Sequence, residues 1–178
     1  MSSTLKRAVG PALVAGLLVT SAAAPAAAQT PGSTAFRIFG GLVGLQARAG
    51  VANVVTATVN ANSHLILTDT KGIAIGPGCT RVPNSTTSAD CGPVSTVTRL
   101  AIALGDGNDS FDGSTVHVNT TVDAGTGTDT VTTDGGNDTI GVQDNAGGDT
   151  VNCGDGGDTD TVFADPGDTV NTNCERRF

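Results

Sequence analysis

Single apolar residues recur at regular intervals through the C-terminal part of this chain, and each follows a glycine-rich stretch and an aspartate. The pattern is clearest where Asp109 precedes Phe111, Asp129 precedes Val131, and Asp138 precedes Ile140. Weaker copies end in Val151, Val162 and Val170. The pattern predicts a chain that turns at each glycine-rich stretch and sends one apolar side chain per turn into a thin core.

The spacing of the aspartates predicts how successive turns stack. Asp109, Asp129, Asp149 and Asp168 are 20, 20 and 19 residues apart. In a two-sided coil alternate turns lie on the same side, so these four form one column. Asp138 and Asp160, or Asp158 in its place, are then expected on the other side.

The same register predicts two facing ladders of core residues. One contains Phe111, Val131, Val151 and Val170, and the other contains Val122, Ile140 and Val162. We expect no helix after the leader. The predicted fold is all-β, a parallel β-roll or β-solenoid with glycine- and aspartate-rich turns over residues 105–178, including a C-terminal cap.

Residues 35–104 are rich in Val, Ile, Leu and Thr and are expected to form a β-rich N-terminal half that starts the solenoid. Residues 54–59 and 65–68 read as strands on either side of a turn at 60–63. In residues 98–104, Leu100, Ile102 and Leu104 alternate with residues that face outward.

The first 28 residues resemble a secretory signal peptide. Lys6 and Arg7 precede an apolar stretch over residues 8–20, and Ala28 ends a small-residue cleavage site. A polar linker is expected over residues 29–34. We therefore expect a secreted, monomeric protein that does not insert into a membrane.

The charge distribution is uneven. Between Arg99 and Arg176 the sequence has 15 acidic residues and no basic one. Such a segment either stays disordered or is neutralised by cations, and the regular apolar residues favour the second alternative. Its acidity also argues against nucleic acid and anionic membranes as partners.

Four cysteines in an exported chain predict two disulfides. Three pairings are open, and we favour Cys79–Cys91 with Cys153–Cys174 because each closes a short local loop. The spacing of neither pair is typical of a zinc site.

The turns offer oxygen ligands from aspartates and from backbone carbonyls. The alternative is that the aspartates only support turns without a metal. We expect calcium, because its ligands are all oxygens and flexible turns suit its large coordination shell. The candidate metal residues are Gly105, Gly107, Asp109, Gly125, Gly127, Asp129, Gly136, Asp138, Asp149, Asp158, Asp160 and Asp168.

No catalytic residue is expected. His64 and His117 read as solvated strand residues, and Ser110 lacks the glycines of a nucleophile elbow. A polysaccharide-acting β-helix enzyme is disfavoured because residues 100–175 contain no Lys or Arg. Threonines after the repeat aspartates are expected in outward ladders, so a surface that binds glycan or ice is the alternative function.

The repeat resembles the hemolysin-type, or RTX, calcium-binding repeat Gly-Gly-x-Gly-x-Asp-x-apolar-x. The N-terminal half is similar to secreted actinobacterial calcium-binding proteins, in the segments Thr68–Ile73, Gly78–Thr80 and Leu104–Asp109. The C-terminal segments Ala164–Val170 and Asn173–Glu175 are similar as well. The resemblance implies a non-catalytic protein that folds as Ca²⁺ binds its turns.

Overall fold

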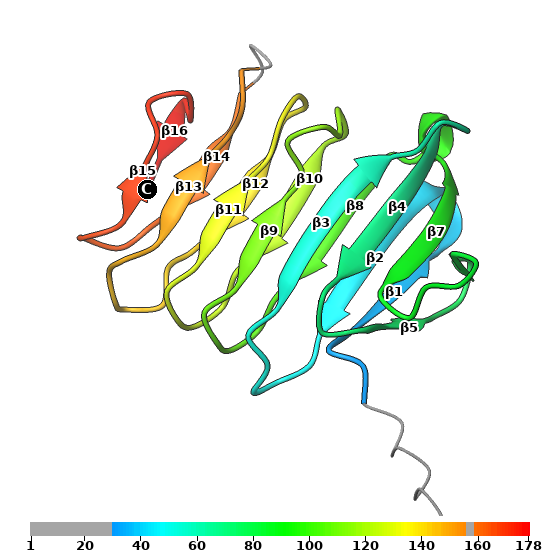
Figure 1. The fold of residues 1–178 in the computed structure, drawn as a ribbon. Helices are drawn as coiled ribbons and strands as arrows, with labels where there is room; N and C mark the ends of the chain where they lie inside the picture. Colours follow the sequence, from blue (N-terminus) through cyan, green and yellow to red (C-terminus); the bar gives the residue numbers. More distant parts are fainter. Residues whose placement is uncertain (1–29, 156–158) are drawn as a thin grey trace, which may run out of the picture.

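The computed structural model describes residues 30–155 and 159–178. The chain forms two eight-stranded sheets that lie face to face (Figure 1). Within the described residues the only helical segments are two 3-10 turns, Phe39–Gly41 and Val94–Thr96. None of these described helices is long and apolar enough to cross a membrane. The expected all-β class is confirmed, while the expected leader lies outside the described residues.

The first sheet has the order β16-β14-β12-β10-β8-β2-β1-β5. Its strands are β1 (Ser33–Arg37), β2 (Leu42–Ala47), β5 (Ile73–Ile75), β8 (Arg99–Ala103), β10 (Thr120–Asp123), β12 (Thr139–Gly141), β14 (Thr161–Phe163) and β16 (Arg176–Arg177).

The second sheet has the order β15-β13-β11-β9-β3-β4-β7-β6. Its strands are β3 (Val54–Val59), β4 (His64–Asp69), β6 (Thr80–Arg81), β7 (Ser88–Pro93), β9 (Ser110–Asp112), β11 (Thr130–Thr132), β13 (Thr150–Asn152) and β15 (Thr169–Val170).

From β8 onward the chain alternates between the two sheets, and every neighbouring pair in this part is parallel. The register aligns Phe111, Val131, Val151 and Val170 in one sheet. It aligns Val122, Ile140 and Val162 in the other. Both predicted ladders are therefore confirmed, and each residue except the partly exposed Val170 is buried. The core depends on a single apolar residue per short strand.

The N-terminal half, which the sequence predicts as the β-rich start of the parallel solenoid, also contains antiparallel pairs. Its pairs β1–β2, β3–β4, β4–β7 and β6–β7 are antiparallel. The predicted strands at 54–59 and 65–68 exist as the hairpin β3–β4, and the inward positions Leu100, Ile102 and Leu104 are buried. Short connections allow adjacent strands to pair antiparallel, whereas parallel pairing needs the chain to cross to the other sheet first.

The expected linker at 29–34 is also shorter than predicted. Strand β1 begins at Ser33, which pairs with Ala47 on one side and Ile73 on the other. Ser33 is buried, so the chain joins the sheet two residues earlier than its polar composition indicated.

Two disulfides fasten the ends of the fold, with the pairing favoured from the sequence. Cys79–Cys91 lies next to the antiparallel strands β6 and β7, and Cys153–Cys174 joins the end of β13 to the segment before β16. Stacked rings of Phe163 and Phe178 also lie at the C-terminal end, with centroids 5.5 Å apart.

Candidate functional site

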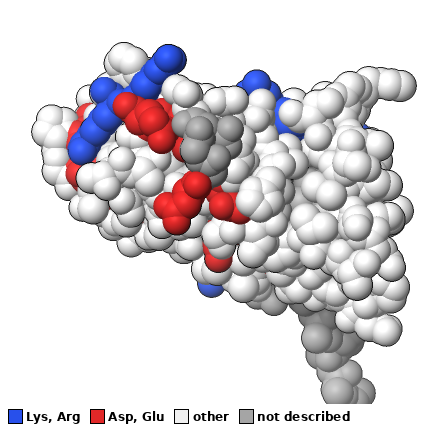
Figure 2. All heavy atoms as spheres, turned by 90° about the horizontal axis from the view of Figure 1, so that it is seen from above, with Lys and Arg blue, Asp and Glu red and all other residues white. Residues whose placement is uncertain are grey.

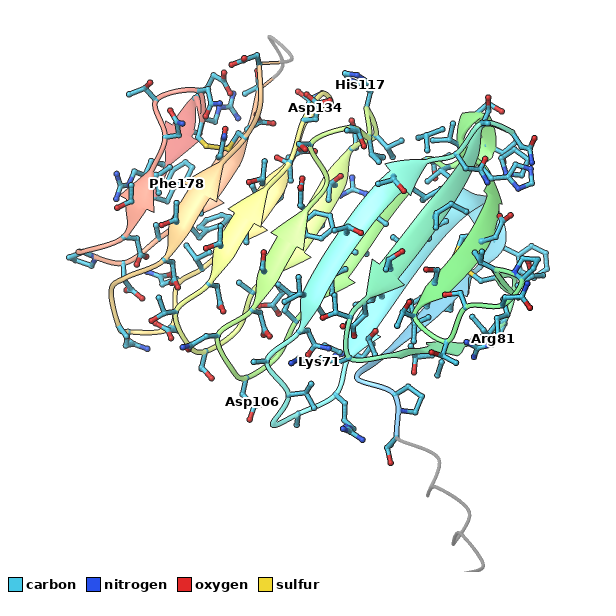
Figure 3. All side chains as sticks on the ribbon, viewed as in Figure 1. Lys71, Arg81, Asp106, His117, Asp134 and Phe178 are labelled. Atoms are coloured by element: carbon cyan, nitrogen blue, oxygen red, sulfur yellow. A yellow bond between two sulfur atoms is a disulfide. The ribbon has the colours of Figure 1, made fainter. Side chains whose placement is uncertain are left out.

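The repeat aspartates form two columns on opposite edges of the fold. Figure 3 shows Asp106 at the lower edge, in the turn before Asp109, and Asp134 at the upper edge, in the turn before Asp138. At the lower edge the parallel register stacks Ser110, Thr130, Thr150 and Thr169, so the aspartates that precede them stack as well. This lower column contains Asp109, Asp129, Asp149 and Asp168, as the spacing predicted.

The carboxylates of the lower column are buried and connect neighbouring turns. The Oδ1 atom of Asp109 accepts a hydrogen bond from the backbone N–H of Asn53, at 2.6 Å. The Oδ1 atoms of Asp129 and Asp149 accept from the N–H of Asp109 and Asp129, each at 2.7 Å. Each carboxylate therefore satisfies an amide one turn earlier in the stack, which a metal-free aspartate can do.

The upper column follows the same rule. Asp138 Oδ1 accepts from the N–H of Thr120, and Asp160 Oδ1 accepts from the N–H of Asp138. Glu175 Oε2 continues the column by accepting from the N–H of Asp160, at 2.8 Å. The structure thus stacks Asp160 on Asp138, while Asp158 lies outside the described residues. The sequence did not indicate Glu175, because it follows no glycine-rich turn.

The second carboxylate oxygens distinguish two kinds of site in the lower column. The Oδ2 atoms of Asp109 and Asp129 are buried and have no hydrogen-bond partner within the described residues. Asp168, in contrast, accepts three backbone hydrogen bonds, from Gly148 and Asp149 at Oδ1 and from Asp165 at Oδ2. A buried acceptor without a partner is unfavourable, so the two regular turns are less well satisfied than the last one.

The electrostatics reinforce this difference. Burial raises the pKa of Asp129 to about 6, opposed by the hydrogen bond from the Asp109 amide and reinforced by repulsion from Asp109, Asp149 and Asp144. Burial also raises the pKa of Asp109 and of Asp149, again against a backbone hydrogen bond. A cation beside these carboxylates would counter both the burial and the repulsion.

The turn glycines allow the turns to touch. Gly105, Gly107, Gly125 and Gly127 all have positive φ, between 87° and 146°. A Cβ on Gly125 would lie 1.7 Å from the Gly105 carbonyl oxygen, and one on Gly127 would lie 1.7 Å from that of Gly107. Gly136, in the upper column, has φ 115°. The glycines are thus needed for the stacking itself as well as for the bend.

The stacked turns also bond directly to each other. The N–H of Thr126 donates to the Gly105 carbonyl, and the N–H of Gly107 donates to the Thr126 carbonyl, both at 2.9 Å. Because a carbonyl oxygen has two lone pairs, these bonds leave the oxygens able to accept a second partner.

Asparagine side chains link each turn to the following one, whereas the aspartates link it to the preceding one. The sequence had not indicated these asparagines as candidate site residues. The Oδ1 of Asn108 accepts from the N–H of Thr128, one turn later, and that of Asn137 accepts from the N–H of Thr159. Asn119 accepts in the same way from the N–H of Asn137. In Asn108-Asp109 and Asn137-Asp138, one side chain therefore binds the following turn and the next binds the preceding turn. The repeated Asn-Asp dipeptide was the available signal.

Two further carboxylates beside the lower column, those of Asp144 and Asp165, were not among the residues that the sequence predicted for the site. Asp144 Oδ2 accepts from the N–H of Gly127, at 3.1 Å, and Asp165 Oδ2 accepts from the N–H of Asp144 and of Asn145. Neither occupies the aspartate position of the repeat, so the repeat pattern could not indicate them. Asp144 brings a further negative charge close to Asp129.

No group of three or more His, Cys, Asp or Glu side chains converges as a metal site within residues 30–155 and 159–178. The histidines form pairs instead: His64 Nδ1 lies 3.0 Å from Asp90 Oδ1, and His117 Nε2 lies 3.3 Å from Asp134 Oδ2. His117 is in a loop, so its expected place in a strand is wrong.

The upper edge carries the acidic groups of the second column. Figure 2 looks onto this edge and shows Asp and Glu side chains gathered on it. Lys and Arg gather at the end of the molecule that carries the C-terminus.

Comparison with known proteins gives no further guide to the site: no family model, no curated protein and no solved structure matches the chain.

Proposed function

We propose that this chain is a secreted, non-catalytic calcium-binding protein, a β-roll similar to RTX repeat proteins, in which Ca²⁺ at the turns drives folding. The alternation of strands between two sheets and the two columns of turn aspartates support the β-roll. The two disulfides favour an oxidising compartment.

One observation carries the proposal: Asp109 and Asp129 each bury a carboxylate oxygen that has no hydrogen-bond partner among the described residues. The two residues are 3% and 1% exposed, and burial raises the pKa of both. A buried carboxylate either keeps a proton or takes a cation as its partner. Calcium at millimolar extracellular concentrations is the cation that oxygen-rich sites of this kind select.

The proposed ligands are the Oδ2 atoms of Asp109 and Asp129 together with backbone carbonyls of the stacked turns. Carbonyls of Gly105, Gly107, Gly125 and Gly127 are the candidates, because these turns lie in direct contact. Such a set does not need three converging side chains. It suits Ca²⁺ better than Mg²⁺, which demands a near-ideal octahedron and gives up its waters reluctantly.

Circular dichroism of the mature chain in chelator and in calcium tests the proposal. We expect β structure and thermal stability to increase on addition of calcium, with little effect of magnesium at the same concentration. Asp129→Asn should remove most of the increase, because the amide keeps an acceptor for the Asp109 N–H but loses the charge. Asp123→Asn is the matched control, because Asp123 is exposed on β10. Identical melting curves in chelator and calcium would contradict the proposal.

A second candidate function rests on the outer face of the second sheet. Thr130, Thr150 and Thr169 are exposed and aligned in register on β11, β13 and β15. Parallel strands space such hydroxyls about 4.8 Å apart, which makes a flat, regular surface for a glycan. Glycan-array binding by the native chain, lost in Thr150→Lys, would favour this function, and an array without signal would exclude it.

A further inference from the structure

The described surface has a hollow whose chemistry is the opposite of the aspartate columns. Its lining includes Lys71 and Arg81 and no Asp or Glu. Its volume is about 660 Å³, within the range of small-molecule sites. Its polar lining comes from Lys71, Arg81, Thr70, Thr86 and Thr87. Pro31 provides apolar surface, whereas Ile73 also lies at the hollow but is fully buried. Figure 3 shows Lys71 and Arg81 in the N-terminal half of the molecule.

The two cations are unusual for this chain. Its formal net charge is −8, and only seven Lys or Arg residues fall within the described ranges. Two of the seven line the same hollow. The salt bridges within the described residues both use histidines, so neither Lys71 nor Arg81 is neutralised by one there. The hollow is therefore a local positive site on a chain that is acidic as a whole.

Arg81 is held in place by backbone groups. Its Nη1 donates to the Ser85 carbonyl and its Nη2 donates to the Ile73 carbonyl, each at 3.2 Å. A guanidinium has five N–H donors, so these two bonds orient the group and leave donors for a ligand. A preoriented arginine loses less freedom on binding than a mobile one.

The lysine side of the hollow is also fixed. Lys71 lies in the turn after β4, where its N–H donates to Asp69 Oδ1 at 2.9 Å and Gly72 adopts φ +91°. The buried carboxylate of Asp69 already accepts from the Asn53 side chain at 2.7 Å. Asp69 offsets part of the positive charge, but as a buried acceptor below the turn it does not line the hollow.

The remaining lining suggests what surrounds the anion. The hydroxyls of Thr70, Thr86 and Thr87 both donate and accept hydrogen bonds, and Pro31 gives apolar contact. A sugar presents this combination of hydroxyls and apolar ring faces. We propose that the hollow binds an anionic sugar of about disaccharide size, with its carboxylate or sulfate between Lys71 and Arg81.

This site does not depend on the proposed calcium turns, and the experiment keeps the two separate. Calorimetry in calcium-containing buffer uses the mature, disulfide-bonded chain with three probes: digalacturonate, a sulfated disaccharide and neutral cellobiose. We expect at least one anionic probe to bind with a dissociation constant on the order of 0.1 mM, and cellobiose to bind far more weakly. The preferred probe identifies the anionic group as carboxylate or sulfate.

Variants assign the binding to the hollow. Lys71→Gln and Arg81→Lys should each weaken the preferred probe by about tenfold, the first by losing a charge and the second by losing the planar guanidinium. Arg99→Gln, on the outer surface of β8, should leave the affinity unchanged. A weaker affinity in Lys71→Gln together with an unchanged affinity in Arg99→Gln excludes a sugar held only through calcium at the turns. Thermal melts of each variant check the fold.

The proposal is overturned if neither anionic probe binds at millimolar concentration, or if cellobiose binds equally well. It is also overturned if Lys71→Gln retains its thermal stability and binds the preferred probe as tightly as the unchanged chain.

Discussion

In the lower column, the turns of Asp129 and Asp168 differ in the hydrogen bonds that they provide to the aspartate carboxylate. Asp129 stands in a turn with both repeat glycines, accepts one backbone hydrogen bond, and has a second oxygen without a partner among the described residues. Asp168 stands in a shortened turn and accepts three backbone hydrogen bonds through both oxygens. The regular turn leaves an oxygen for a cation, whereas the irregular turn closes onto its own carboxylate.

The difference separates two roles within one register. At Asp168 the carboxylate stabilises the turn by itself, because it gives a partner to three backbone amides, one buried and two part-buried. At Asp129 burial raises the pKa to about 6, so the ionised group is unfavourable until something compensates its charge.

The C-terminal disulfide should have the largest effect. Replacing Cys153 and Cys174 by Ala should lower the free energy of unfolding by about 3.5 kcal/mol, because the bridge spans 21 residues and restricts the unfolded chain. Chemical denaturation measures the loss. Calcium should not restore it, because both oxygens of Asp168, in the last turn of the lower column, already accept backbone hydrogen bonds; full rescue by calcium would contradict the comparison.

Asp168→Ala should have the next largest effect. In chelator we expect the free energy of unfolding to fall by about 2–3 kcal/mol, since three backbone amides, one of them buried and two part-buried, lose their acceptor. Asp129→Asn should be neutral or stabilising under the same conditions, because it keeps an acceptor and removes an unfavourable charge. Urea denaturation of both variants measures the contrast, and a larger loss from Asp129→Asn would reverse the assigned roles.

The raised pKa of Asp129 predicts a pH dependence without metal. Its folded-state pKa of about 6 lies above the unfolded value near 3.9. Between these values the folded chain keeps a proton that the unfolded chain has lost, so stability falls as the pH rises from about 4 to about 6.

The expected loss in chelator is on the order of 1 kcal/mol for this group. Asp129→Asn should flatten the corresponding part of the pH profile of urea denaturation. If the variant keeps the same slope, Asp129 is not the titrating group.

The sequence predicted the features that depend on local pattern. The hairpin of β3 and β4 follows from apolar residues on either side of a turn, and the two ladders follow from the spacing of Phe111, Val131 and Ile140. The alignment of the four lower aspartates required only that spacing. In the ladders and in the aspartate column, one repeat of the sequence corresponds to one step from a strand or turn to the next one stacked on it.

The sequence could not predict what depends on partners distant in the chain. The backbone amides that donate to Asp109 and Asp129 belong to the neighbouring turn. Which amide donates therefore depends on how the turns stack and not on the repeat. Asn53 is the clearest case: it is fully buried, donates its N–H to Asp109 and its side chain to Asp69, yet lies outside every repeat. The antiparallel pairing of β1 with β2 is likewise set by contacts that no periodicity records.

Asn108→Ala should cause the smallest loss among the variants expected to destabilise the fold. It removes one acceptor from the exposed Thr128 N–H, which water can replace, so we expect a loss of about 0.5–1 kcal/mol. Its calcium affinity should change little, because Asn108 holds the turn and is not a proposed ligand. Urea denaturation with and without calcium measures both; a larger loss of calcium affinity than in Asp129→Asn would make Asn108 part of the site.

Calorimetric titration of Ca²⁺ into the unchanged chain, Asp129→Asn and Asp168→Asn separates a calcium ligand from a residue that only supports its turn. We expect that Asp129→Asn removes at least one bound ion or weakens binding by about tenfold. Asp168→Asn, checked for its fold, should bind calcium as the unchanged chain does. Equal titrations for the two variants, or a greater loss from Asp168→Asn, would show that Asp129 is not the calcium ligand that distinguishes the two turns.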